Sequence, residues 1–187
     1  GLYRTEYLFL ERKTMPDVQE QQKEYEKVFD LLDGKELIVR TLDIGGDKRV
    51  PYLPQEQEEN PFLGVRGIRF TLKHPEILEA QMEAMLLAAK GRPFSIMLPM
   101  VDTVQEVEQA RAIWDKVCKK VSENGVAVNP DIRIGITIET PAAAICVDTF
   151  IGKADFVSIG SNDLAQYVMA ADRESVELDH LLSPWQT

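Results

Sequence analysis

The chain has 187 residues, a formal net charge of −10 and a hydrophobic content of 44%. This length supports one domain with its own core, and the hydrophobic share is ordinary for a globular protein. The acidic balance argues against partners such as nucleic acid or anionic membranes, although a few arginines in one cleft can oppose the global field. No apolar run approaches the roughly 20 residues of a membrane-spanning helix, and the start has no signal-peptide pattern. Cys118 and Cys146 are expected on helices, which favours reduced thiols in the cytoplasm.

Strand-like and helix-like segments alternate along the chain. Segments rich in β-branched residues predict strands at residues 2–9, 36–43, 94–98, 132–139 and 156–159. Helices are expected between them: one begins at 14–17 and ends at Gly34, one begins at Pro75, one runs from a capping box at 103–106 to about Gly125, and a shorter one spans 142–150. This alternation predicts a parallel sheet covered by helices.

The segment 132–139 distinguishes a barrel from an open sheet. Its isoleucines share one face, and Arg133, Gly135, Thr137 and Glu139 share the other, because side chains alternate across a strand. An isoleucine face suits a layer of helices and a mixed face suits a barrel interior, whereas a doubly wound open sheet is more often apolar on both faces. A complete barrel needs about 250 residues, so we predict an incomplete (β/α)₈ barrel with about five βα units over 1–187.

Polar residues cluster at the expected strand ends, where barrels of this kind place their active sites. Several guanidinium groups suit a ligand that carries both phosphate and carboxylate, and two carboxylates with open coordination positions suit Mg²⁺. Arginines beside such a carboxylate pair predict a phosphoryl-transfer site. The candidates are Arg4, Arg40, Arg66, Glu139, Asn162, Asp163 and Arg173.

These residues also have purely structural interpretations. Arg40 could be an interior partner of Asp43, and Arg4 could simply be solvated. Glu139 could cap the neighbouring helix, and Asp163 could be a helix-start residue. Their shared placement at strand ends is the reason to prefer a common site.

Five longer motifs, in order, carry a family resemblance. They occupy residues 2–6 (LYRTE), 39–48 (VRTLDIGGDK), 59–66 (ENPFLGVR), 138–143 (IETPAA) and 159–173, which begins IGSNDLAQY and ends DR. Together they resemble enzyme I, the phosphoenolpyruvate–protein phosphotransferase family of the bacterial sugar phosphotransferase system. The resemblance implies a (β/α)₈ barrel that binds phosphoenolpyruvate and Mg²⁺ and forms a homodimer.

The resemblance assigns the substrate site. It implies that Arg4 and Arg40 hold the substrate phosphate and that Arg66 assists them. Arg173 with Asn162 would complete the cradle.

The resemblance also assigns the metal site. Glu139 and Asp163 would bind Mg²⁺, which bridges the carboxylate and phosphate oxygens of the substrate, and Asp163 also counts among the substrate ligands. No catalytic residue is expected within this chain. The family passes the phosphoryl group to a histidine in a separate N-terminal domain and protonates the enolate with a cysteine on a later strand. His74 and His180 are not expected strand-end residues and are not assigned as the acceptor.

The parent enzyme would therefore transfer the phosphoryl group of phosphoenolpyruvate to its own histidine, release pyruvate and pass the group to a histidine-containing phosphocarrier protein. The phosphohistidine domain and the last barrel strands are expected outside 1–187, so this segment alone would not turn over. An open part-barrel leaves strand edges and apolar interior positions exposed, so self-association or marginal stability is expected.

Three other interpretations stay open. A pyruvate phosphate dikinase or phosphoenolpyruvate synthase resembles enzyme I in this barrel and carries a nucleotide-binding domain elsewhere in its gene. A Mg²⁺-dependent enolate lyase on a similar barrel would not need four convergent arginines. A non-catalytic module that dimerises and only senses phosphoenolpyruvate would bind the ligand without transferring its phosphoryl group.

Overall fold

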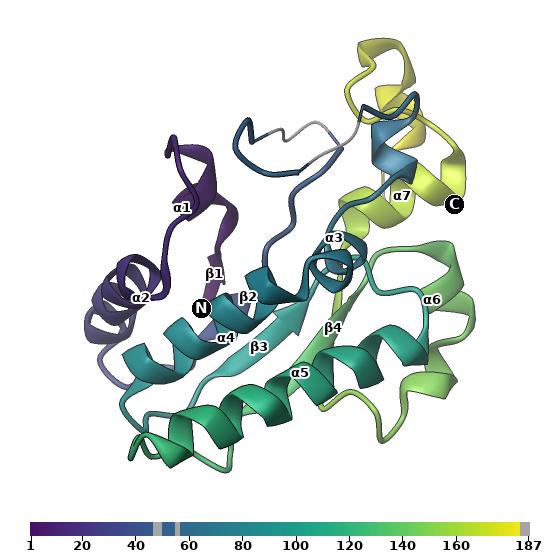
Figure 1. Ribbon diagram of the computed structural model, residues 1–187. Helices are drawn as coiled ribbons and strands as arrows, with labels where there is room; N and C mark the ends of the chain where they lie inside the picture. The colour runs from purple at the N-terminus through teal and green to yellow at the C-terminus, as the bar shows by residue number, and fades with distance from the viewer. Residues whose placement is uncertain (47–49, 55–56, 184–187) are drawn as a thin grey trace.

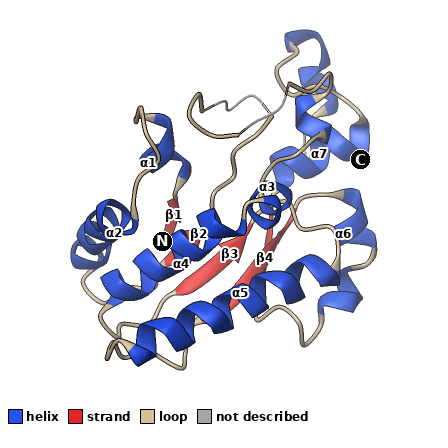
Figure 2. Ribbon diagram, in the orientation of Figure 1, coloured by secondary structure: helices blue, strands red, loops and turns tan. Residues whose placement is uncertain are grey.

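A curled parallel sheet lies at the centre of the structure, a computed structural model that describes residues 1–46, 50–54 and 57–183 (Figures 1 and 2). Within these residues, five strands pair in chain order: β1 (Leu2–Arg4), β2 (Ile38–Arg40), β3 (Ser95–Leu98), β4 (Arg133–Ile138) and β5 (Val157–Ile159). All four pairings are parallel, and Arg4 lies opposite Arg40 in the register of β1 and β2. This arrangement confirms the predicted incomplete (β/α) barrel of five units.

Helices connect the strands, and three of them form a layer over the outer face of the sheet. The helices are α1 (Glu6–Leu10), α2 (Val18–Leu32), α3 (Ile68–Lys73), α4 (Pro75–Ala89), α5 (Val104–Glu123), α6 (Pro141–Ile145) and α7 (Ser161–Met169), with 3₁₀ turns η1 (Pro61–Leu63), η2 (Val147–Phe150) and η3 (Val176–Leu181). Helices α2, α4 and α5 lie side by side along the outer face (Figure 2). Reciprocal capping boxes begin two of them, Asp17 with Glu20 at α2 and Thr103 with Glu106 at α5, so the predicted helix starts are confirmed.

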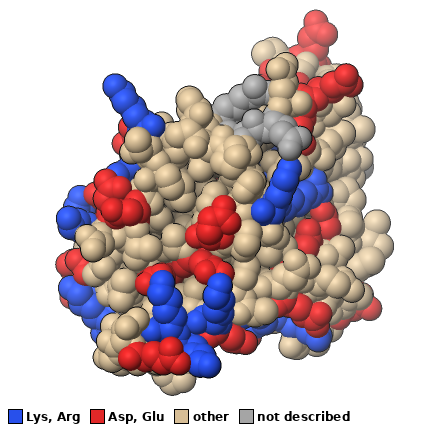
Figure 3. Space-filling view, in the orientation of Figure 1, with Lys and Arg blue, Asp and Glu red and all other residues tan. Residues whose placement is uncertain are grey.

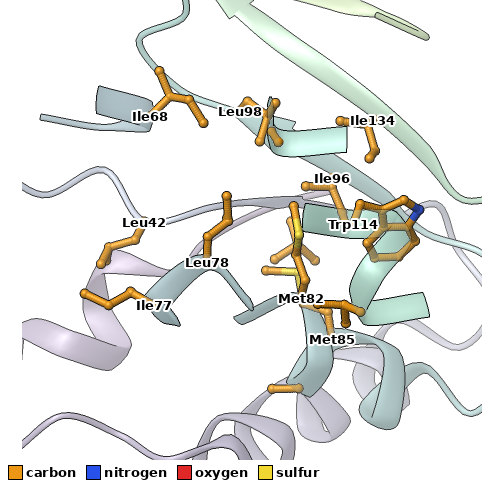
Figure 4. Close-up of a cluster of buried hydrophobic side chains, with 14 of the residues drawn as sticks. Leu42, Ile68, Ile77, Leu78, Met82, Met85, Ile96, Leu98, Trp114 and Ile134 are labelled. Atoms are coloured by element: carbon orange, nitrogen blue, oxygen red, sulfur yellow. The ribbon is translucent and has the colours of Figure 1, made fainter. Parts of the chain in front are cut away.

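The hydrophobic core lies between this helix layer and the sheet. Leu78, Met82 and Met85 of α4 gather with Ile96 of β3 and Trp114 of α5 (Figure 4). Fully burying one such side chain contributes roughly 1.5–3 kcal/mol. The isoleucines of β4 also enter this core, which leaves the other face of the strand to polar residues, as the alternation predicts.

The first predicted strand is wrong beyond Arg4. The neighbouring strand β2 ends at Arg40, the register partner of Arg4, so later residues have no strand beside them to pair with. The chain turns into α1 instead, which buries Leu8 and Phe9. The connection after β2 also contains two elements that the sequence did not predict, η1 and α3. The helix expected over 142–150 divides at Cys146 into α6 and η2.

The outer surface is mixed in charge on the face that carries α4 and α5 (Figure 3). Lys116 pairs with Glu79 and Lys120 with Glu83 across these two helices. None of the described helices is both long and apolar enough to cross a membrane. Residues 47 and 48 of the second motif, and 184–187, lie outside the described parts of the chain.

Apolar side chains are exposed around β5. Ile159 on this strand, Ile145 on α6 and Val168 on α7 are 73%, 81% and 60% exposed. In the described parts of the chain, β5 pairs only with β4, so it forms one edge of the sheet. These exposed positions are of the kind expected for an open part-barrel, and self-association stays a prediction.

Candidate functional site

The carboxyl ends of the parallel strands form a rim, which we define by the ends of β1 to β5 and the segments that follow them. The arrows of β3 and β4 point towards the end of the sheet where α3 and α7 lie (Figures 1 and 2). Arg4 and Arg40 are the last residues of β1 and β2, and Glu139 directly follows β4. Because all strands run the same way, these side chains belong to one end of the fold.

Charged side chains are linked across this rim in a continuous chain of contacts, here called the rim network. Its members, in order, are Glu6, Arg40, Asp43, Arg66, Asp163 and Arg173. The Arg40 Nη2 atom donates to Glu6 Oε1 at 2.8 Å and lies 3.4 Å from Asp43 Oδ2. Arg66 Nη2 lies 3.2 Å from the same Asp43 oxygen. Arg66 and Arg173 then converge on Asp163 Oδ1, at 2.9 and 3.1 Å.

Glycines allow the chain segments of the rim network to approach each other. Gly45 has φ +120°, and a Cβ atom there would lie 2.4 Å from Arg66 Cβ. The Gly67 N–H donates to the Ile44 carbonyl at 3.2 Å across the same contact. Since only glycine tolerates both this φ and this approach, the segment after β2 packs against the segment before α3 and brings Asp43 to Arg66.

Phe62 connects the loop after β2 to α7. Its ring faces two guanidinium groups, with Arg66 Cζ 5.9 Å and Arg173 Cζ 5.1 Å from the ring centroid. The Tyr167 hydroxyl donates to the Phe62 carbonyl and accepts from Arg66 Nη1 at 3.3 Å. Cation–π contacts and hydrogen bonds together restrict both arginines.

Glu139 is almost completely buried, at 2% exposure. Its Oε1 atom accepts the Met100 N–H at 2.7 Å, which ties the end of β4 to the end of β3. Burial, together with the nearby carboxylates of Asp43 and Asp163, raises the pKa of Glu139 to about 7, against the opposing effects of this hydrogen bond and of Arg40. Burial therefore makes the charged form of Glu139 less favourable here than it is in water.

Two arginines of the rim network keep donors for an anion. Burial lowers the pKa of Arg40 and of Arg66, but carboxylates outweigh burial and raise both, so both stay charged. The Nε atoms of Arg40 and Arg66 are buried and have no hydrogen-bond acceptor among the described residues. A buried donor without an acceptor is costly, and a phosphate or carboxylate oxygen would remove that cost.

The donor set fits a cation that takes part of its coordination from a substrate. In the ranges 1–46, 50–54 and 57–183, no three His, Cys, Asp or Glu side chains gather in a way that could hold a metal ion. Glu139 and Asp163 can supply two oxygen ligands, and a cation beside these two buried carboxylates would offset the cost of burying their charge. Mg²⁺ prefers oxygen and commonly combines one or two carboxylates with substrate phosphate.

The structure places the seven predicted residues at the rim to different degrees. Arg40, Arg66, Asp163 and Arg173 are joined in the rim network, and Glu139 lies within electrostatic range of Arg40 and Asp163. The side chain of Arg4 is exposed and makes no hydrogen bond or ion pair with any residue that the structure describes, although its backbone lies opposite Arg40. Asn162 is also exposed, on the first turn of α7. The roles of all seven residues in binding a ligand or metal stay a prediction.

The structural alternatives are only partly realised. Arg40 does contact Asp43, and Asp163 does lie in the first turn of α7. Glu139 caps no helix, because Thr140 is the N-cap of α6 and accepts the Ala143 N–H at 3.3 Å.

Sequence reasoning did not assign several residues that hold this site together, and Asp43 was considered only as an interior partner of Arg40. Glu6, Phe62 and Tyr167 all lie inside the quoted motifs, but only the fold shows that they contact Arg40, Arg66 or Arg173. Gln81 of α4 accepts the Leu42 N–H at 3.0 Å beside the rim, and its amide among apolar residues of that helix was the available sequence signal.

A parallel part-barrel with arginines and carboxylates at its strand ends defines the class of this domain. The chain belongs to the family described as PEP-utilising enzyme, PEP-binding domain, whose model matches residues 1–187. Within that class it is similar to phosphoenolpyruvate-protein phosphotransferases: it is 46% identical over 185 residues to that of Staphylococcus epidermidis and 45% identical to that of Bacillus subtilis. Each match covers 99% of this chain and 32% of the relative, so the chain spans about a third of the length of these curated relatives. The resemblance to enzyme I is thereby confirmed.

Proposed function

We propose that residues 1–187 form the substrate-binding part of a phosphoenolpyruvate–protein phosphotransferase. The observation that carries this proposal is the rim network, in which three arginines from distant parts of the chain meet beside Glu139 and Asp163. Family membership supports phosphoenolpyruvate as the ligand. The acceptor histidine and the remaining barrel strands belong, in this proposal, to other parts of the parent protein.

The arginines act by binding and orienting the phosphate. Arg4, Arg40 and Arg66 contact phosphate oxygens, and Arg173 with Asn162 closes the other side. As the P–O bond of the substrate loosens, charge spreads over the phosphoryl oxygens, and guanidinium groups already held in place stabilise it without reorganising. Asp43 and Asp163 hold the guanidinium groups of Arg66 and Arg173 before the ligand arrives.

Glu139 and Asp163 would hold Mg²⁺, which neutralises charge on the carboxylate and phosphate oxygens of the ligand. The P–O bond breaks, a P–N bond forms to the acceptor histidine, and the released enolate takes up a proton to give pyruvate. A histidine-containing phosphocarrier protein then receives the group. The parent acts as a homodimer in the cytoplasm.

Calorimetric titration tests the binding step. The full-length parent protein should bind phosphoenolpyruvate in the presence of Mg²⁺. Arg40→Ala should weaken this binding about 10- to 100-fold, because a hydrogen bond to a charged group contributes about 1.5–3 kcal/mol. Arg40→Lys keeps the charge but loses the planar fork, so it should weaken binding less. Arg133→Ala removes an exposed arginine at the other end of β4 and should change nothing. Equal affinity of the wild type and both Arg40 variants would contradict the proposal.

Phosphoryl transfer needs its own measurement. Incubation with phosphoenolpyruvate labelled on phosphorus should put acid-labile label on a histidine of the parent. Binding without any transfer would instead support a module that only senses the ligand.

A further inference from the structure

Glu6 is a buried carboxylate that the proposed substrate and metal sites do not use. It lies in the first turn of α1, two residues after the end of β1, and is 3% exposed. Charged carboxylates are rarely buried to this extent unless they are paired. One oxygen, Oε1, accepts both from Arg40 Nη2 at 2.8 Å and from the Asp43 backbone N–H at 3.2 Å. This oxygen therefore fixes a side chain and the main chain at the end of β2.

A second buried side chain anchors the segment that carries Glu6. Gln81 of α4 is fully buried, and its Nε2 atom donates to Thr5 Oγ1 at 3.1 Å. Its Oε1 atom accepts the Leu42 N–H at 3.0 Å. Thr5 and Glu6 are thus tied to residues 42–43 by two independent sets of hydrogen bonds, so Glu6 acts from a fixed base.

The contacts of Arg40 show why an anchored Glu6 matters. The 2.8 Å contact to Glu6 is a hydrogen bond, whereas the 3.4 Å separation from Asp43 Oδ2 is only a close ion pair. Arg40 Nε remains without an acceptor among the described residues. An arginine has many rotamers, and ordering it when a ligand binds costs entropy. Holding Nη2 in advance removes much of that cost and leaves other donors for a ligand.

We propose that Glu6 is a positioning residue that orients Arg40 for the phosphate half of the ligand. Glu6 does not touch the ligand in this scheme; it acts through the guanidinium group. The inference rests on the proposed function, because it assumes that Arg40 meets the phosphate. It extends that function by predicting that loss of Glu6 impairs recognition of one half of the ligand and not the other.

Two substitutions separate geometry from charge. Glu6→Asp keeps the charge but withdraws the carboxylate by one methylene group from Arg40. Glu6→Gln keeps the length and an acceptor oxygen but loses the charge. Glu36→Gln is the control, because Glu36 is an exposed acid whose salt bridge to Arg133 lies at the other end of the sheet.

The experiment measures the dissociation constants of two probes in the presence of Mg²⁺. It uses the full-length parent protein. Phosphoglycolate carries a phosphate and a carboxylate, whereas oxalate carries two carboxylates. Glu6→Asp should weaken phosphoglycolate binding about tenfold, and Glu6→Gln should weaken it about threefold, with oxalate affinity within twofold of the wild type. Melting temperatures, recorded for every variant, show which proteins are folded.

The outcomes separate this inference from the proposed function. Parallel loss of both probes in the folded Glu6 variants would show a structural role and overturn the inference, as would unchanged phosphoglycolate affinity in both variants. Either result leaves the proposed function standing, provided that the wild type binds phosphoglycolate. A wild type that binds neither probe would remove the proposed function and this inference with it.

Discussion

The two ends of the sheet use the same kinds of ion pair in different surroundings. At the amino end, Arg133 Nη2 lies 2.7 Å from Glu36 Oε1, and the two side chains are 52% and 65% exposed. At the rim, Arg66 Nη2 lies 3.2 Å from Asp43 Oδ2, and these side chains are 3% and 2% exposed. Exposed pairs contribute about 0–1 kcal/mol, whereas removing one partner of a buried pair costs roughly 3–5 kcal/mol. A buried ion pair adds little net stability, because removing the charges from water offsets their attraction. The buried pairs of the rim are therefore better explained as a surface prepared for a ligand.

The largest expected contrast is in stability. Asp43→Asn removes the carboxylate shared by Arg40 and Arg66 and should lower the free energy of unfolding by roughly 3–5 kcal/mol. Glu36→Gln should lower it by less than about 1 kcal/mol. Urea unfolding of both variants measures the difference. Similar losses of unfolding free energy in the two variants would mean that burial does not make the rim ion pairs more important for stability than the exposed pair.

A pair of glycines sharpens the comparison through the backbone. Gly34 and Gly45 both have positive φ, +79° and +120°, but a Cβ atom at Gly34 meets nothing within 4 Å. Gly34→Ala should therefore cost only the strain of the left-handed conformation, about 1–2 kcal/mol. Gly45→Ala adds a clash with Arg66 and should cost roughly 2–4 kcal/mol and weaken phosphoenolpyruvate binding. Equal melting temperatures for the two variants would contradict the close approach at the rim.

A matched pair of tyrosines gives a smaller effect. Tyr167 donates to the Phe62 carbonyl at the rim, and Tyr25 donates to Gln21 Oε1 at 3.1 Å in the outer layer. Tyr167→Phe and Tyr25→Phe should each lower the free energy of unfolding by about 1 kcal/mol. Only Tyr167→Phe should also weaken ligand binding, because Tyr167 contacts Arg66. If calorimetry shows the same ligand affinity for both, the Phe62 contact has no part in binding.

The smallest effect concerns the two cysteines, of which Cys118 is half-buried and Cys146 is exposed. Burial and the nearby Asp115 raise the pKa of Cys118 to about 11, and Cys146 is exposed. A raised pKa keeps the thiol protonated, so the reactive thiolate of Cys118 is scarce at pH 8 and increases as the pH rises towards 11. Iodoacetamide at pH 8 should label Cys146 first, as peptide mass spectrometry can show. Faster labelling of Cys118 would place that thiol outside the packed layer.

The sequence predicted the parts of the fold that follow from local chemistry. Capping residues located the starts of α2 and α5, and the alternation in 132–139 separated the core face of β4 from its polar face. The end of β1 was not predictable in this way, because it depends on where the neighbouring β2 ends. Helix α3 was missed for a similar reason: its buried residues, Ile68 and Phe70, lie in a short segment whose pattern is too brief to identify.

In the candidate site, too, local features could be predicted from the sequence and contacts between distant residues could not. Motifs identified charged residues at strand ends, since strand ends can be located one at a time. They did not reveal which acid pairs with which arginine, because Glu6 and Arg40 are 34 residues apart and Arg66 and Asp163 are 97 apart. Those pairings depend on the register of the sheet and on the approach allowed at Gly45.

One structure would test the central claim most directly: crystals of the protein grown with phosphoglycolate and Mn²⁺, a substitute for Mg²⁺ that anomalous scattering can locate. The account predicts the phosphate within hydrogen-bonding distance of Arg40 and Arg66, and the metal between Glu139 and Asp163. A ligand bound away from the strand ends, or a metal that contacts neither carboxylate, would contradict it.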